Sequence, residues 1–154
     1  MRKKTIKLPI IFIIVILAAY AINTSLPIAS ESTYVTKVVD GDTIVVAGGR
    51  NVRLLNIDTR ERGENCYQEA KDRMIELVLL KNVTLEADKE DKDRYDRLLR
   101  YVYVEGEMVN LQMVRDGLAV VYIIPPNEKY REQFETIEGA ALDEETGCVW
   151  TTSP

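Results

Sequence analysis

Histidine is absent from the 154-residue sequence, and cysteine and tryptophan are scarce, with two residues and one residue respectively. Histidine is the residue most suited to proton transfer near neutral pH and a common metal ligand. Any acid–base chemistry must therefore use carboxylates, lysine, tyrosine or arginine. The only thiols, Cys66 and Cys148, are far apart in the sequence. They form neither a zinc motif nor a Cys-x-x-Cys redox motif.

A surplus of basic residues is also lacking. The first 30 residues hold four of the 20 basic residues and no acid, so residues 31–154 contain 16 basic against 25 acidic residues. A domain that binds nucleic acid over a wide surface is usually basic. The composition argues against a large nucleic-acid footprint, but it leaves room for a small phosphate-binding cleft that relies on a metal ion.

The N-terminal 30 residues read as a signal or anchor segment. Residues 1–7 are basic, residues 8–22 form the apolar run LPIIFIIVILAAYAI, and the small residues of Ala19-Tyr20-Ala21 suit a cleavage site. The run is shorter than a typical spanning helix, but residues 26–29 would extend it to that length. The sequence leaves open a cleaved signal or a retained membrane anchor, and a buried helix of the domain is disfavoured because the run has no polar face. Either alternative predicts that residues 31–154 are exported, and an oxidising compartment permits a Cys66–Cys148 disulfide in place of two unpaired thiols.

The pattern of residues 31–154 predicts a single α+β domain. Alternating β-branched residues and turn signals indicate strands at residues 33–39, 43–46, 52–57, 82–87 and 98–104, the first three forming an antiparallel meander. Helical spacing indicates helices at residues 67–80, 109–115 and 128–145, with Gly117 just after the second. Five short strands with an inserted helix and two closing helices favour an OB-fold barrel with three helices.

Three stretches concentrate unusual polar residues: D-G-D-T at residues 40–43, R-L-L-N-I-D-T-R-E at 53–61 and R-Y-D-R at 94–97. Asp42 and Asp58 flank strand ends, where two carboxylates can share a hard cation such as calcium. The plainer interpretation is that such aspartates cap turns. Arg53 lies among apolar neighbours, so its side chain either points into water or lies in a cleft, where its planar fork suits a phosphate.

Together these motifs resemble the staphylococcal nuclease (thermonuclease) family. The likeness runs over residues 35–150 and includes Q-E-A at 68–70, M-V-N at 108–110, V-R-D-G-L-A at 114–119 and the closing Trp150. It implies an OB-fold barrel with three helices. It also implies a monomeric, calcium-dependent nuclease that cleaves DNA and RNA with low sequence specificity and leaves 3′-phosphorylated products.

The resemblance also implies residue roles. By motif position, Asp42, Asp58 and the backbone carbonyl of Thr59 correspond to calcium ligands. Arg94 and Tyr95 match positions that contact a substrate phosphate.

The catalytic positions are implied in the same way. Arg53 and Arg97 correspond to the two catalytic arginines, and Glu61 corresponds to the general base. All of them are present, which favours an enzyme over the inactive, RNA-binding copies of this domain that occur in larger proteins. A generic OB-fold binder, which relies on aromatic platforms, is a weaker alternative because no aromatic cluster stands out beyond Tyr101 and Tyr103.

The sequence departs from the family pattern at three points. Arg60 stands where proline is common, which predicts a looser loop around Glu61. Asp96 replaces a usual glycine and is expected to place a negative charge beside Arg97. Of the tyrosines that line the nucleotide pocket in some members, only Tyr122 is a match.

Overall fold

The computed structural model describes residues 30–150. The predicted N-terminal signal or anchor helix, with its apolar run at residues 8–22, lies outside the described residues. Within residues 30–150, the chain forms no helix with the length and hydropathy needed to cross a lipid bilayer.

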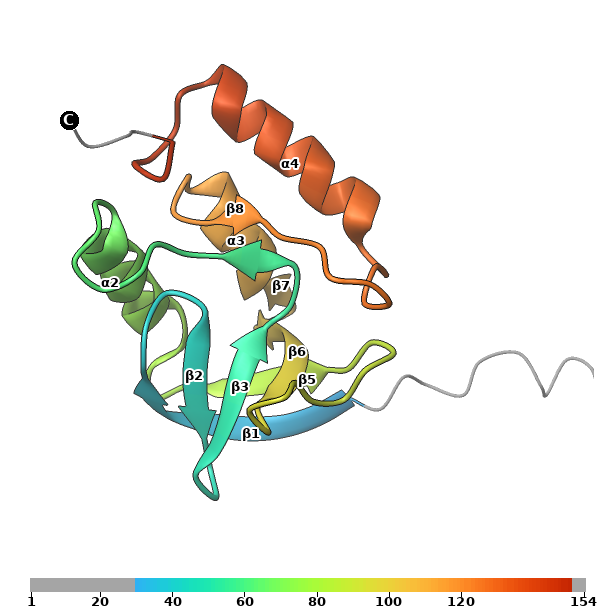
Figure 1. The fold of residues 1–154 in the computed structure, drawn as a ribbon. Coiled ribbons are helices and arrows are strands. Elements are labelled where there is room, and N and C mark those ends of the chain that lie inside the picture. Colours follow the sequence, from blue (N-terminus) through green and yellow to red (C-terminus); the bar gives the residue numbers. More distant parts are fainter. Residues whose placement is uncertain (1–29, 151–154) are drawn as a thin grey trace, which may run out of the picture.

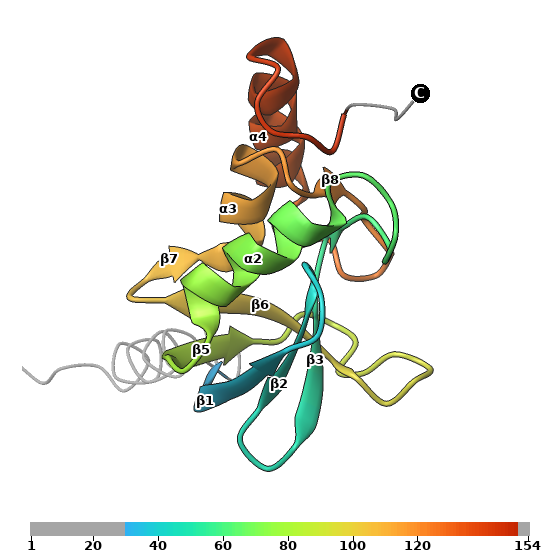
Figure 2. The same ribbon diagram turned by 90° about the vertical axis from the view of Figure 1, so that its left-hand side faces the viewer.

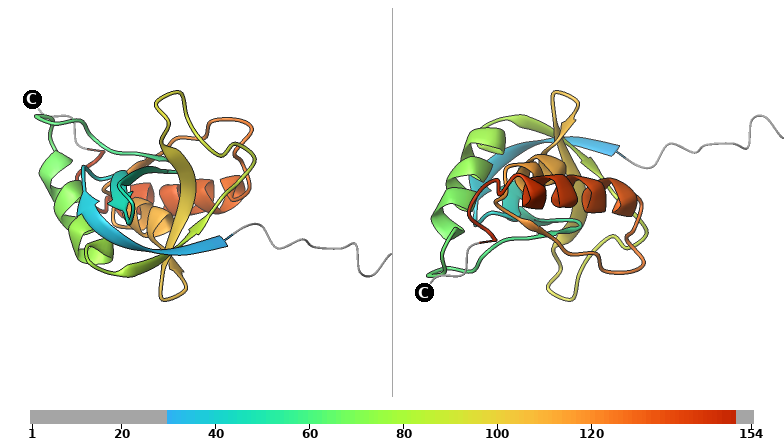
Figure 3. Two further views of the ribbon diagram at one scale, coloured as in Figure 1. Left: turned by 90° about the horizontal axis from the view of Figure 1, so that it is seen from below. Right: turned by 90° about the horizontal axis from the view of Figure 1, so that it is seen from above.

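Five strands close into a barrel, as the sequence predicts (Figure 1). They are β1 (Ser30–Val38), β2 (Thr43–Val46), β3 (Arg50–Leu54), β5 (Asn82–Glu86) and β6 (Leu98–Val104). The meander β1–β2–β3 is antiparallel, and β5 joins β1 to β6 by antiparallel pairing. A parallel pairing of β3 with β6 closes the barrel, and the full set of strands around its axis is visible from below in Figure 3.

The predicted strand at residues 52–57 is in fact two strands. β3 ends at Leu54, and Asn56 has a φ of 63°, which turns the chain before β4 (Ile57–Asp58). Asparagine adopts this left-handed conformation more readily than most residues. β4 then leaves the barrel and pairs with β8 (Val120–Val121). This break places Asp58 away from the barrel wall, in a position that strand periodicity does not reveal.

Three helices cover the barrel, in the predicted order. They are α2 (Tyr67–Val78), α3 (Val109–Arg115) and α4 (Arg131–Asp143), and the short strand β7 (Glu107–Met108) precedes α3. Figures 1 and 2 show α3 and α4 stacked over one end of the barrel and α2 along its side. Helical spacing explains α2, because Ala70, Met74 and Val78 form one apolar stripe and all three are buried.

One hydrophobic core fills the barrel and continues under the helices. Strand residues such as Val35, Ile44 and Leu85 pack in the same cluster as Met113 of α3 and Phe134 of α4. Because the barrel and the helices share this core, loops at the end of the barrel are held against a common rigid body.

Cys66 and Cys148 form a disulfide in the structure, with their Cα atoms 5.4 Å apart across 82 residues of sequence. Cys66 immediately precedes α2, and Cys148 lies in the segment that follows α4. The bond therefore connects the loop before α2 to the C-terminal segment of the domain.

Replacing both cysteines by serine is expected to lower the free energy of unfolding by about 2–5 kcal/mol, because the disulfide closes a long loop and restricts the unfolded chain. Urea unfolding of the wild type with and without a reducing agent, beside the double variant, measures the effect. The reducing agent should leave the double variant unchanged. Equal stability of the oxidised and reduced wild type would contradict the prediction.

Candidate active site

The D-G-D turn between β1 and β2 places Asp42 against the first residues after β4. A Cβ atom on Gly41 would lie 2.8 Å from Thr59 Cγ2 and 2.9 Å from Ala70 Cβ, so only glycine fits there. Asp40 Oδ1 accepts a hydrogen bond from the Asp42 amide at 3.1 Å. Asp40 is therefore a turn residue, the role that the plainer interpretation of the sequence gave to Asp42 and Asp58.

Asp42 is buried and tied to Thr59. Its Oδ2 atom accepts hydrogen bonds from the Thr59 amide at 3.0 Å and from the Thr59 hydroxyl at 3.1 Å. Its Oδ1 atom accepts a bond from the Thr43 hydroxyl at 3.0 Å. These bonds fix the orientation of the carboxylate and hold the start of the loop after β4 against the β1–β2 turn.

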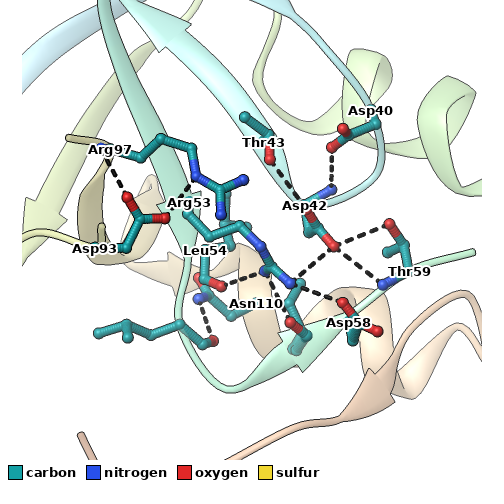
Figure 4. A network of polar contacts seen from close by, with 12 residues as sticks. Asp40, Asp42, Thr43, Arg53, Leu54, Asp58, Thr59, Asp93, Arg97 and Asn110 are labelled. Carbon is teal, nitrogen blue, oxygen red and sulfur yellow. Dashed lines mark hydrogen bonds and ion pairs between the residues drawn. The ribbon is translucent and has the colours of Figure 1, made fainter. Parts of the chain in front are cut away.

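The side chain of Arg53 lies in the cleft between the two aspartates and does not point into water (Figure 4). Its Nη2 atom is 2.8 Å from Asp58 Oδ1 and 3.1 Å from Asp42 Oδ2. Its Nη1 atom donates to the carbonyls of Leu54 and Ile57, both at 2.8 Å. The turn between β3 and β4 thus wraps around the guanidinium and fixes it in one orientation.

The contacts of Arg53 bring one oxygen of Asp42 and one oxygen of Asp58 to the same guanidinium nitrogen. In the described part of the chain, no three Asp, Glu, Cys or His side chains come together as a metal cluster. A bound ion would thus have two carboxylates, a nearby backbone carbonyl and water as its ligands. Calcium accepts this kind of flexible oxygen shell, and magnesium is more demanding. The donor set fits calcium.

Negative charge accumulates around Asp58. Burial raises the pKa of Asp58 above its ordinary value, the charge of Arg53 opposes this, and the charges of Asp42, Glu61 and Glu64 raise it further. Burial and the charge of Asp42 likewise raise the pKa of Asp40. The single guanidinium of Arg53 does not fully compensate these carboxylates, which is the electrostatic setting in which a divalent cation binds favourably.

Arg97, the other candidate arginine, is held by Asp93. Arg97 Nε donates to Asp93 Oδ2 at 2.7 Å, and the amides of Tyr95 and Arg97 donate to Asp93 Oδ1 at 2.9 and 3.0 Å. Figure 4 shows this pair beside Arg53. From the sequence, residues 90–96 indicate only a charged loop, and the acid four residues before Arg97 was the one available signal for Asp93.

A cavity of about 600 Å³ is lined by Arg53, Arg97, Arg94, Tyr95 and Tyr122. The guanidinium carbons of Arg94 and Arg97 lie 4.8 and 5.4 Å from the centre of the Tyr95 ring, within the range of cation–π contacts. The structure therefore brings both candidate arginines and both candidate phosphate-contact residues to the wall of one cavity. Its size and its cationic groups suit a nucleotide.

Glu61 lies on the other side of the Arg53–Asp58 pair. It is exposed and lines a second cavity, of about 320 Å³, together with Asp58, Thr59 and Glu64. Its backbone amide donates to Glu64 Oε2 at 2.7 Å, and its carbonyl accepts from the Glu64 amide at 3.0 Å. Within residues 30–150, Glu61 makes no direct hydrogen bond to Asp42, Asp58 or the two arginines, but it lines one cavity with Asp58 and its charge raises the pKa of Asp58.

The structure shows the surroundings of two of the residues that depart from the family pattern. The Asp96 carboxylate is mostly exposed and pairs with Lys92 at 2.7 Å, and the acid that contacts the Arg97 side chain is Asp93. Asp96 has a φ of 63°, the left-handed conformation that glycine adopts most easily. Arg60 donates through Nη2 to the carbonyl of Val149 at 2.7 Å, and the looser loop stays a prediction.

Comparison with known proteins agrees with this geometry. A family model described as staphylococcal nuclease homologue matches residues 51–152. The thermonuclease of Staphylococcus intermedius is 34% identical over 83% of this chain and 81% of its own length. The thermonuclease of Staphylococcus hyicus is 37% identical over 73% of each chain.

A longer relative comes from Bacillus subtilis (strain 168), the SPbeta prophage-derived endonuclease YokF. It is 42% identical over 75% of this chain, but this chain spans only 42% of its length. The region that matches the family model, residues 51–152, includes most of β3, the Arg53–Asp58 pair, the loop with Glu61 and the segment with Arg97. By fold, by site and by these matches, the chain belongs to the staphylococcal nuclease family and carries its nuclease domain.

Proposed function

We propose that this domain hydrolyses phosphodiester bonds in DNA and RNA with the help of a calcium ion, with little sequence specificity, and leaves 3′-phosphorylated products. The observation that carries the proposal is the position of Arg53. Its Nη2 atom contacts both Asp42 and Asp58, while the same side chain lines the cavity that contains Arg97. Asp42 and Asp58, the proposed cation ligands, therefore contact a guanidinium that shares a cavity with Arg97.

Asp42, Asp58 and the carbonyl of Thr59 would hold the calcium ion, which when bound supplies a Lewis acid that polarises a phosphate oxygen. Asp42 is oriented for this task by Thr43 and Thr59.

The remaining chemistry is assigned to this chain's own side chains. Glu61 orients the attacking water and takes its proton, a role that its place beside Asp58 supports. Arg53 and Arg97 donate hydrogen bonds to the phosphate oxygens, where negative charge increases in the transition state. Arg94 and Tyr95 contact a neighbouring phosphate from the wall of the larger cavity.

Low specificity follows from the kind of contacts available. The groups assigned to the substrate bind phosphate, and phosphate contacts position a nucleic acid without reading its sequence. The acidic domain offers no broad cationic surface for a duplex. Single strands and frayed ends are therefore the proposed substrates, in preference to a stable duplex.

We also propose that the domain is exported, either secreted or anchored at the outer face of the cytoplasmic membrane through residues 8–22. The disulfide of the described domain supports this, because such bonds persist in oxidising compartments and are rare in the cytosol. The basic residues ahead of the apolar run support the same orientation.

The function is tested by cleavage of denatured DNA with calcium, with EGTA and with the variant Glu61→Gln. We expect EGTA to abolish cleavage and Glu61→Gln to lower kcat by roughly 100-fold or more, since general-base catalysis contributes about 10²–10⁴. Glu132→Gln, which alters an exposed carboxylate on α4, is the matched control and should be fully active. Full activity of Glu61→Gln, or cleavage that is indifferent to EGTA, would reject the mechanism.

Arg97→Ala is expected to lower kcat by roughly 100- to 1,000-fold, because one hydrogen-bond donor to the transition state is lost. The melting temperature should fall as well, because Arg97→Ala removes the ion pair with Asp93, so kcat is compared at a temperature at which both proteins are folded. Arg115→Ala, at an exposed position in α3, removes the same charge and should have little effect. A loss confined to KM would instead mean that Arg97 binds the substrate and its transition state equally well.

Asp93 gives the site a defined pH dependence. Burial raises the pKa of Asp93. Hydrogen bonds from the Arg97 side chain and from the amides of Arg97 and Tyr95 lower it by more, so the pKa of Asp93 in the folded protein is below its ordinary value of 3.8. Because the pKa of Asp93 is lower in the folded than in the unfolded state, the Asp93 charge stabilises the fold at pH values above the ordinary pKa. This stabilisation is lost as the pH falls through the folded-state value.

Asp93→Asn is therefore expected to lower the free energy of unfolding by about 1–3 kcal/mol at pH 7, with the difference from the wild type narrowing as the pH falls below 3.8. Urea unfolding at a series of pH values measures both effects. Asp96→Asn, in the same loop but mostly exposed, should change stability by less than about 1 kcal/mol. A difference that stays constant across the pH series would contradict the role given to the Asp93 charge.

A further inference from the structure

The loop between β4 and α2, which carries Glu61, is fastened to the C-terminal segment at both of its ends. At its start, Arg60 Nη2 donates to the carbonyl of Val149 at 2.7 Å. At its end, Cys66 is bonded to Cys148. Two adjacent residues of the C-terminal segment thus hold a loop that lies more than 80 residues earlier in the chain.

The C-terminal segment is itself rigidly placed. The amides of Cys148 and Val149 both donate to the carbonyl of Gly117 at 3.0 Å, at the end of α3. Contact here is so close that a Cβ atom on Gly117 would lie 1.7 Å from the carbonyl oxygen of Thr146. Val149 is buried. The carbonyl that receives the Arg60 side chain therefore belongs to a fixed part of the domain.

Arg60 and Val149 also border the cavity that contains Glu61. The cavity of about 320 Å³ is lined by Asp58, Thr59, Arg60, Glu61, Glu64 and Val149. Inside the loop, the reciprocal hydrogen bonds between Glu61 and Glu64 make a compact turn. A turn of this kind moves as a unit, so the position of Glu61 relative to Asp58 depends on where the two ends of the loop are fastened.

We propose that Arg60 is a positioning residue of the nuclease reaction. By binding the Val149 carbonyl it fixes the backbone beside Glu61, and with it the distance of the Glu61 carboxylate from the Asp42–Asp58 pair. The inference rests on the proposed role of Glu61 as the base. It makes Arg60 the residue that fixes the backbone from which the exposed Glu61 side chain acts.

The test compares Arg60→Ala with Arg62→Ala, which removes the same charge from an exposed position of the same loop. Both are measured as full-length protein on denatured DNA with calcium. Arg60→Ala is expected to lower kcat by about ten- to a hundredfold, the cost of a small misplacement of a catalytic group, with KM changed less than twofold. Arg60→Lys keeps a donor and should recover part of the loss. Arg62→Ala should match the wild type.

The decisive measurement repeats Arg60→Ala in a Glu61→Gln background, at raised enzyme concentration. If Arg60 acts through Glu61, the second change should cause no further loss of kcat, because coupled residues are not additive. An equal fold-loss in both backgrounds, or a kcat for Arg60→Ala equal to that of Arg62→Ala, overturns the proposal. Should Arg60→Ala fail to fold, judged by circular dichroism, the same comparison is made with Arg60→Met, which keeps the length of the side chain but has no donor for the Val149 carbonyl and whose wild-type kcat would overturn the proposal. Full activity of Glu61→Gln alone rejects the proposed function instead, so the two failures are distinguishable.

Discussion

Two carboxylates and one guanidinium hold this site together. Asp42 comes from the turn between β1 and β2, and Asp58 comes from β4, yet both contact the same nitrogen of Arg53. Burial raises the pKa of Asp58, the charge of Arg53 opposes this, and repulsion from the neighbouring acids raises the pKa further. The arrangement persists because Gly41 lets the turn approach Thr59 and because the closed barrel fixes the distance between the two strand ends.

The Arg53–Asp58 pair also divides the site into two halves with different chemistry. The larger cavity contains arginines and Tyr95, and the smaller one contains Glu61 and Glu64. In the proposed mechanism, phosphate binding and water activation would therefore lie in two separate cavities that share one border. A local concentration of arginine suits an acidic domain that binds a polyanion. Short-range, partly desolvated contacts then replace the long-range attraction of a basic surface.

Tertiary contacts also decide how the loops around the site are held. Asp93 orients Arg97 from within its own loop, and Val149 restrains Arg60 from the far end of the chain. Asp96, the immediate neighbour of Arg97 in the sequence, pairs with Lys92 and has a left-handed backbone conformation. The motifs alone do not reveal these pairings, since they depend on contacts that the side chains make in the folded domain.

The sequence by itself determined the order of the strands and helices and favoured a barrel, because alternation and helical spacing are local properties that the chain carries in its order of residues. The candidate residues came from the resemblance of three motifs to a known family. The tertiary structure decided that Arg53 lies in the cleft, that the strand at residues 52–57 breaks at Asn56, and that Asp93 is the partner of Arg97. It also decided that Arg60 and Cys66 meet the C-terminal segment. Contacts between residues more than 80 positions apart arise only when the barrel and α3 are in place. Local sequence patterns therefore do not reveal these long-range contacts.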